Sequence, residues 1–175
     1  MNSTDLNSTN KDVRYPPEAL GLNIVEIEEK IIDFKARYKV SPLYRDLSHE
    51  ELAKIIKAKV ITENFAAKNL EDVEGILISS DETEIFLPTY GYNENEKRFT
   101  VAHEIGHFFL HKKETGTMVA AHFGVGPVED EASSFAGALL MPKDDLEQAY
   151  RIFRRFDMVA AYFKVTVEAC QGANP

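Results

Sequence analysis

The stretch His103-Glu104-Ile105-Gly106-His107 constrains this chain more than any other part of its sequence. On an α-helix, residues four apart lie on one face, roughly 6 Å apart along the axis, so the two imidazoles can converge on a single metal ion. Glu104 is rotated by about 100° from His103 and points beside that ion. The spacing therefore makes Glu104 the candidate base for a metal-bound water.

The residues around this motif predict that its helix is buried. The apolar flanks are Phe99, Val101, Ala102, Ile105, Phe108, Phe109 and Leu110. Buried imidazoles need partners, and a metal ion supplies them. The alternative is a pair of core histidines bonded to the backbone, but Glu104 would then be a third costly polar group buried at the same place.

Length and composition bound the classes of protein to consider. The chain has 175 residues and a net charge of −9, enough for one domain with a substantial core, and the charge argues against a basic nucleic-acid-binding face. Cys170 is the single cysteine, so an internal disulfide is excluded. No stretch is long and apolar enough to span a bilayer, and the N-terminus lacks the features of a signal peptide. We expect a cytoplasmic protein that binds neither membrane nor nucleic acid.

The apolar periodicity predicts an α+β fold, a compact and mainly helical domain over residues 14–175 that follows a disordered tail over residues 1–13. Helices are expected at 23–38, 48–57, 127–140, 143–153, 157–165 and 166–170, the last three forming a C-terminal group packed on the domain. Strands at 60–62, 75–79 and 84–87 predict a small, three-stranded, mostly antiparallel sheet before the motif helix, with a hairpin turn at 80–83. Residues 89–97 and 112–127 are expected to be loops.

Three further residues belong to the motif helix. Thr100 is a candidate for its N-terminal cap, and Arg98 for an ion pair or a helix-start residue. His111 lies eight residues beyond His103, roughly 12 Å along a helix, and so cannot share an ion with it. We expect His111 near the helix C-terminus, where the dipole favours a partly charged imidazole.

Two histidines do not complete a catalytic zinc site, which usually has three protein ligands and a water. The acidic run Glu129-Asp130-Glu131, which enters the next helix, is the best source of a third ligand. Helical periodicity barely distinguishes Glu129 from Glu131 as the third ligand. The alternative is that these acidic side chains only stabilise the positive end of that helix.

Two segments together resemble the ImmA/IrrE family of metallo-endopeptidases. The first runs from Arg98 to His107 and follows the family pattern R-F-T-x-A-H-E-x-G-H. The second runs from Glu129 to Pro142 and follows E-x-x-A-(N/D)-x-F-A-x-x-L-L-M-P, except that Ser133 stands where the family usually has Asn or Asp. Residues 159–166 resemble the L-A-x-x-F-x-V-S that commonly follows, so the resemblance covers about residues 50–170.

The resemblance implies a site and a reaction. His103, His107 and Glu129 would hold zinc, with manganese as the alternative ion, and Glu104 would be the general base. The residue at position 133 could orient a ligand histidine. The implied reaction is hydrolysis of a peptide bond, and His122, Tyr90 and Tyr92 are candidates to stabilise the oxyanion.

The resemblance also implies a substrate, because such family members typically cleave a helix-turn-helix repressor encoded beside them, in stress responses or mobile elements. The alternative is a toxin-like or otherwise non-catalytic regulatory partner that binds such a repressor without cleaving it. Glu104 favours the enzyme, since a pure binding protein has no need of that carboxylate.

Overall fold

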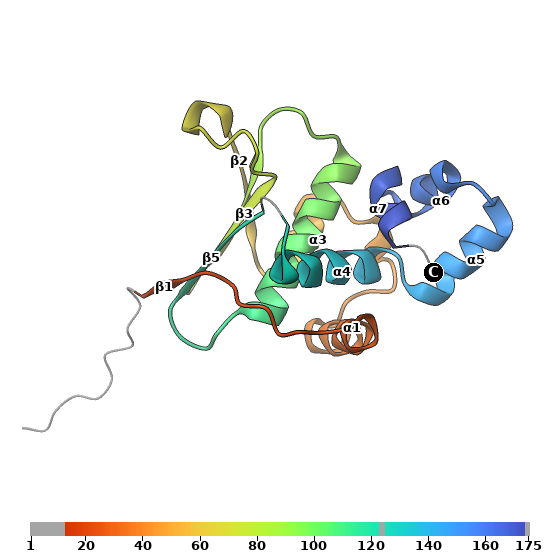
Figure 1. Ribbon diagram of the computed structural model, residues 1–175, viewed down its shortest axis with the longest axis horizontal. Helices are drawn as coiled ribbons and strands as arrows, with labels where there is room; N and C mark the ends of the chain where they lie inside the picture. Colours follow the sequence, from red (N-terminus) through yellow and green to blue (C-terminus); the bar gives the residue numbers. More distant parts are fainter. Residues whose placement is uncertain (1–12, 123–124, 174–175) are drawn as a thin grey trace, which may run out of the picture.

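The computed structural model describes residues 13–122 and 125–173 (Figure 1). The helices are α1 (Ile24–Tyr38), α2 (His49–Ile55), α3 (Glu94–His111), α4 (Pro127–Leu140), α5 (Lys143–Phe153), α6 (Phe156–Phe163) and α7 (Val167–Gly172). The strands are β1 (Arg14–Tyr15), β2 (Lys59–Glu63), β3 (Gly75–Ser79), β4 (Thr83–Pro88) and β5 (Thr117–His122). Except for Val13, the expected disordered tail lies outside the described residues.

The sheet is larger than the sequence indicated. It has five strands in the order β1-β5-β3-β4-β2. The prediction of three mostly antiparallel strands was therefore wrong in the number of strands, and of the three predicted strands β2 runs parallel to its neighbour β4. Strand β3 is antiparallel to β4 and β5, whereas β2 is parallel to β4 and β1 is parallel to β5. The connection over residues 64–74 places β3 on the far side of β4 from β2, and the expected turn at 80–83 then joins β3 to β4.

Strand β5 lies in a segment that the sequence predicted to be a loop. It pairs with β3 over five residues, from Gly75↔His122 to Ser79↔Met118. Ala120 and Ala121 have little intrinsic strand preference, so this strand depends on main-chain pairing with a partner far away in the sequence. Its other side pairs with β1, a strand too short to be recognised without that partner.

Helix α3 lies between the sheet and α4 (Figure 1). Helix α1 packs against α4, and α5, α6 and α7 gather at the end of the molecule away from the sheet. The central core joins these layers through fully buried side chains, among them Leu77, Ile85, Met118, Val101, Ile105, Phe135 and Leu139. The motif helix is therefore buried, as its apolar flanks predicted.

The motif helix begins earlier than expected. Asn93 is its N-cap and accepts hydrogen bonds from the backbone of Asn95 and Glu96, while the Glu96 carboxylate accepts one from Asn93. This reciprocal capping box satisfies the first free N–H groups of the helix. Thr100 is a buried residue of the helix interior, so its assignment as the cap was wrong.

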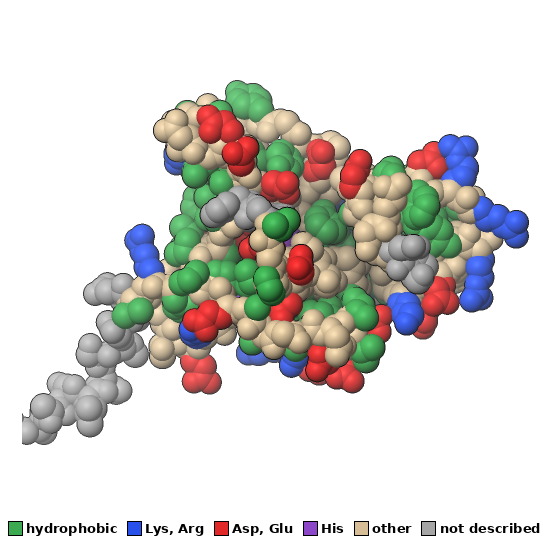
Figure 2. Space-filling model, in the orientation of Figure 1, with side chains coloured by type: hydrophobic (Ala, Val, Ile, Leu, Met, Phe, Trp, Pro, Cys, Tyr) green, Lys and Arg blue, Asp and Glu red, His purple; other side chains and the backbone are tan. Residues whose placement is uncertain are grey.

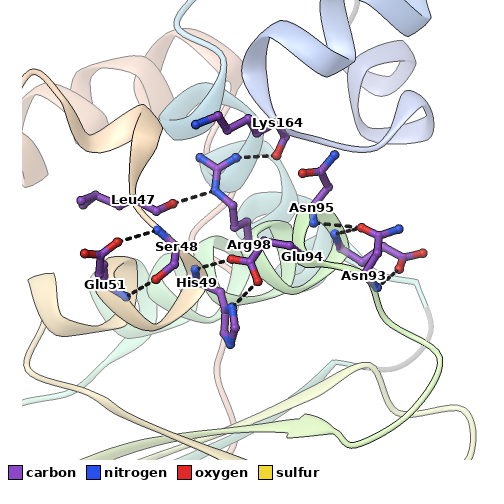
Figure 3. Close-up of polar contacts among 10 residues, drawn as sticks. Leu47, Ser48, His49, Glu51, Asn93, Glu94, Asn95, Arg98 and Lys164 are labelled. Carbon is purple, nitrogen blue, oxygen red and sulfur yellow. Dashed lines mark hydrogen bonds and ion pairs between the residues drawn. The ribbon is translucent and has the colours of Figure 1, made fainter.

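Arg98 fixes the first half of α3 to two distant segments (Figure 3). Its guanidinium is buried and donates hydrogen bonds to the main-chain oxygens of Arg45, Leu47, Phe163 and Lys164. Burial lowers the pKa of this side chain, yet the four carbonyl acceptors replace the water it gives up. Arg98 is thus structural, but it lies in the second turn of α3 and acts through backbone carbonyls rather than through an ion pair.

No helix within the described ranges combines the length and the apolar character that crossing a bilayer requires.

Candidate metal centre

Helix α3 presents His103 and His107 on one face, a single turn apart, as the spacing predicts. Both side chains are fully buried, and their Nε2 atoms lie 3.0 Å apart. Two ring nitrogens at this distance face a common point rather than separate backbone partners.

The first turn of α4 brings Glu129 to the same point. Its Oε2 lies 3.1 Å from His103 Nε2, and its Oε1 lies 3.5 Å from His107 Nε2. Burial raises the pKa of Glu129, but hydrogen bonds from the two imidazoles outweigh burial and hold that pKa well below its ordinary value of 4.5. Glu129 therefore faces the histidines as a carboxylate.

Gly106 allows the two helices to approach closely enough for this convergence. A Cβ atom added at Gly106 would lie 3.0 Å from the main-chain oxygen of Ala132 and 3.1 Å from its Cα atom. Because α4 begins with Pro127 at a position that suits the first turn of a helix, Glu129 comes one turn before this contact. The glycine inside the motif thus serves the packing that positions the carboxylate.

The three side chains fit a metal ion. Their donor atoms all lie within 4.8 Å of one another. A tetrahedral ion with bonds of about 2.0 Å separates its donors by roughly 3.3 Å. The two Nε2 atoms lie 3.0 Å apart, and they lie 3.1 and 3.5 Å from Glu129 Oε2 and Oε1, respectively, which is close to that value. Two imidazoles and a carboxylate are also a donor set of catalytic zinc sites. Among the described side chains, which do not include that of His122, no other group of three His, Cys, Asp or Glu residues converges in this way.

Glu104 lies one position along α3 and is completely buried. Neither of its carboxylate oxygens has a hydrogen-bond partner among the described residues. Burial and, to a lesser extent, the negative charge of Glu129 raise the pKa of Glu104 well above its ordinary value of 4.5. A buried carboxyl group without partners is costly, and its high proton affinity is what a proton-accepting group needs.

The strand above Glu104 leaves room for its carboxylate. A Cβ atom added at Gly75, the first residue of β3, would lie 2.8 Å from Glu104 Oε1 and 2.6 Å from Thr100 Cγ2. A glycine at this position therefore lets the sheet close over the carboxylate without displacing it.

Ser133 supports His103 from α4. Its Oγ lies 3.1 Å from His103 Nδ1, so an Nδ1–H can donate to the hydroxyl while Nε2 faces the other donors. The serine, at the position where the family pattern usually has Asn or Asp, is long enough to reach this ring.

His111 and Glu131 support His107 on the Nδ1 side of its ring, away from the Nε2 atom that faces the other donors. His111 Nδ1 lies 3.1 Å from His107 Nδ1, and His111 Nε2 lies 2.9 Å from Glu131 Oε2. His111 ends α3 as predicted, but it is buried there, and burial lowers the pKa of its imidazole more than Glu131 raises it. The expectation of a partly charged imidazole favoured by the helix dipole was therefore wrong.

The candidates for oxyanion stabilisation lie in the segment between β4 and α3 and at the end of β5. The Tyr90 side chain is 78% exposed. Tyr92 lies near Glu74 and Glu96, where burial and then these two charges raise the pKa of its hydroxyl to about 12. His122 ends β5 opposite Gly75, and its side chain lies outside the described part of the molecule. The role of all three stays a prediction.

A groove of about 670 Å³ lies between α1, α4 and α7. Phe99, one turn before His103 on α3, and Ser133 both line it. Most of its remaining lining is apolar and includes Ile24, Val25 and Ala138.

Sequence reasoning missed the link between His111 and Glu131, although one signal for it was present. His111 follows His107 by four residues, so both rings lie on one helical face, and Glu131 was already a candidate to face that helix. The role of Gly75 left no such signal, because its contact with Glu104 depends on the packing of β3 against α3.

Two comparisons with known proteins agree with this geometry. The chain is 32% identical over 101 residues to metallopeptidase ImmA of Bacillus subtilis (strain 168). That match covers 55% of this chain and 60% of the relative, so the chain spans less than two thirds of that protein's length. The family model for the IrrE N-terminal-like domain, Peptidase_M78, matches residues 53–171, which contain α3, β5, α4 and every candidate site residue. The chain belongs to the Peptidase_M78 family, which is the ImmA/IrrE family that its two motifs resemble.

Proposed function

We propose that this protein is a zinc-dependent endopeptidase that hydrolyses a peptide bond in a specific protein. The observation that carries the proposal is the convergence of His103, His107 and Glu129 beside Glu104, a buried carboxylate to which the described residues offer no hydrogen bond. The family match and the metallopeptidase relative support the same class of reaction.

The three candidate ligands and Glu104 have different roles in the proposed reaction. His103, His107 and Glu129 would hold zinc, which when bound polarises the scissile carbonyl and makes a water molecule more acidic. Glu104 takes the proton from the attacking water and later delivers it to the leaving amine. Its raised pKa suits both transfers, because the carboxyl group holds a proton strongly enough to accept it and then to act as an acid.

The proposed substrate is a helix-turn-helix transcriptional repressor. The family resemblance supports this class of substrate, and the charge around the centre is compatible with a basic partner. In Figure 2, Asp and Glu side chains lie mainly across the upper part of the face and along its lower edge, whereas Lys and Arg lie towards its edges. Glu74 directly precedes β3, the strand beside Glu104, and its charge and that of Glu96 both act on Tyr92, so two acidic groups lie close together near this strand.

The decisive experiment incubates the purified protein with each repressor encoded beside its gene, with zinc or with a chelator, and identifies products by mass spectrometry. We expect one internal cleavage that the chelator abolishes. Glu104→Gln should lower the rate by about 10²- to 10⁴-fold, the usual contribution of an acid–base group, without loss of zinc binding.

A matched pair of variants tests the third ligand. Glu129→Gln should lose both zinc and activity, whereas Asp130→Asn, an exposed neighbour on the same helical turn, should keep both. If Glu104→Gln still inactivated the repressor in cells, cleavage would not be the mechanism and the non-catalytic alternative would replace this proposal.

A further inference from the structure

A third histidine extends the candidate centre beyond the residues that the proposed reaction uses. His111 contacts His107 on one side and Glu131 on the other, at 3.1 and 2.9 Å. His111 is 5% exposed and Glu131 is 4% exposed. Neither residue reaches the point where the donor atoms of His103, His107 and Glu129 meet.

The chain of contacts continues into the N-terminal part of the molecule. The Glu131 carboxylate accepts hydrogen bonds from the backbone N–H of Leu20, at 3.0 and 2.9 Å to its two oxygens, and of Leu22, at 2.8 Å. Between these residues, Gly21 has a φ of +75°, a value that glycine adopts without strain. The turn aims two N–H groups at one carboxylate and fixes it in the interior.

A single arrangement of hydrogen atoms satisfies this chain when His107 offers the lone pair of Nε2 to an ion. In a neutral imidazole the other nitrogen then carries the hydrogen, so His107 Nδ1–H donates to His111 Nδ1. His111 must carry its own hydrogen on Nε2, which donates to Glu131 Oε2. Glu131, as an ionised carboxylate, accepts from His111, Leu20 and Leu22.

We propose that His111 and Glu131 are positioning residues, which hold the His107 ring in the orientation and tautomer that bind the metal ion. The proposal rests on the proposed function, since it takes His107 to be a ligand. A ligating histidine usually donates its second N–H to a carboxylate, a carbonyl or a water molecule, and loss of that partner typically weakens metal binding. Here an interposed imidazole extends the reach of a carboxylate that lies on α4.

The structure contains a second histidine–glutamate pair that serves as an internal control. His49 Nδ1 lies 2.8 Å from Glu94 Oε2 near the start of α3 (Figure 3). Glu94 lies nine positions before His103 on the same helix, so this pair joins α2 to α3 without reaching the centre. Breaking it removes a contact of the same kind and leaves His107 supported.

The test measures zinc affinity by competition with a chromophoric chelator, and it records the visible spectrum of the cobalt-substituted protein. Glu131→Gln and His111→Leu should each weaken zinc binding by about 10- to 100-fold and alter the cobalt spectrum. His111→Gln should recover part of the affinity, because its amide oxygen can accept from His107 while its NH₂ group donates to Glu131. Glu94→Gln should bind zinc as the unaltered protein does.

Thermal unfolding of the metal-free variants separates positioning from a purely structural role. If Glu131→Gln and His111→Gln lower the melting temperature but bind zinc with unchanged affinity, the two residues only stabilise the fold and the proposal is wrong. If His111→Leu does not fold, the comparison of Glu131→Gln with Glu94→Gln decides alone. Failure of the unaltered protein to bind zinc would instead overturn the proposed function on which this inference rests.

Discussion

Gly75→Ala tests whether the sheet determines where Glu104 lies. The added Cβ atom would approach Glu104 Oε1 to 2.8 Å and Thr100 Cγ2 to 2.6 Å, whereas ordinary van der Waals contact begins at 3.4 Å. Relief of the first contact alone requires the carboxylate to retreat by about 0.6 Å, the difference between 3.4 and 2.8 Å. Overpacking of this size typically costs about 1–3 kcal/mol of stability.

The expected effect on catalysis follows from that displacement. A misplacement of about 1 Å in an active site can cost about 10²-fold in rate, so Gly75→Ala should lower the rate of peptide cleavage by roughly 10- to 100-fold. Zinc affinity should stay within about threefold of the unaltered protein, because the atoms that the added Cβ would approach most closely belong to Thr100 and Glu104. Single-turnover cleavage of the substrate, together with zinc competition, measures both quantities on one preparation.

Gly172→Ala is the matched control, because a Cβ atom there would meet no atom within 4 Å. It should cleave substrate at the normal rate. Normal cleavage by Gly75→Ala, in a protein that Glu104→Gln inactivates, would show that the close fit over Glu104 has no catalytic role. A loss of zinc affinity in Gly75→Ala would refute the separation between the carboxylate and the ligands.

Three other variants test the packing around the site. Gly106→Ala gains about 0.5–1 kcal/mol of helix propensity but loses about 1–3 kcal/mol to overpacking against Ala132, so urea unfolding should show a small net loss, and zinc should bind more weakly because α4 moves with Glu129. Arg98→Met leaves four main-chain carbonyls without their donor and should cost about 3–5 kcal/mol in the same assay; a loss below about 1 kcal/mol would contradict its anchoring role. Burial raises the pKa of Glu131, but hydrogen bonds from Leu20, Leu22 and His111 lower that pKa by more than burial raises it, so the pKa lies below its ordinary value of 4.5. The stability that metal-free protein gains over Glu131→Gln should therefore be complete above about pH 5.5 and decline as the pH falls through and below 4.5, whereas a stability difference independent of pH would show that the charge of Glu131 contributes nothing.

The local features of this fold could be predicted because short-range rules determine them. The four-residue spacing of His103 and His107 requires only helical geometry, and the structure has both rings converging. The capping box of Ser48 and Glu51 opens α2 as the sequence indicates. The same rule applied to Asn93 and Glu96 would have placed the start of α3 correctly. The sequence therefore contained the information for the correct N-cap, and the assignment of Thr100 overlooked it.

The sheet could not be derived in this way, because its strands are determined by partners distant in the chain. Strand β5 contains Ala120 and Ala121, which favour no strand by themselves, and β3 supplies the pairing that makes them one. The parallel pairing of β2 with β4 depends on the path of residues 64–74 and not on any residue within the strands. Both errors concern pairing, whereas the position of most helices was predicted to within a few residues.

Helical periodicity could not decide between Glu129 and Glu131 as the third ligand, because that choice depends on the tertiary structure. The two residues lie on opposite flanks of one helical stripe, and both turn out to face α3. Glu129 meets His103 and His107, whereas Glu131 meets His111. Both acidic residues thus contact a histidine, which is why an argument from the helical face alone left them nearly equivalent.

The candidate donor atoms are held near ion-binding distances by contacts that also form the core. The contacts that fix α4 to α3 include the Gly106–Ala132 packing, the Ser133–His103 hydrogen bond and the Glu131–His111 hydrogen bond. Because buried packing fixes these contacts, little conformational freedom remains to be lost when an ion binds. Changes that move α3 and α4 apart should therefore weaken metal binding even when every ligand is intact. A change at Gly75 in β3 should instead act on Glu104, because a Cβ atom added there would meet that carboxylate.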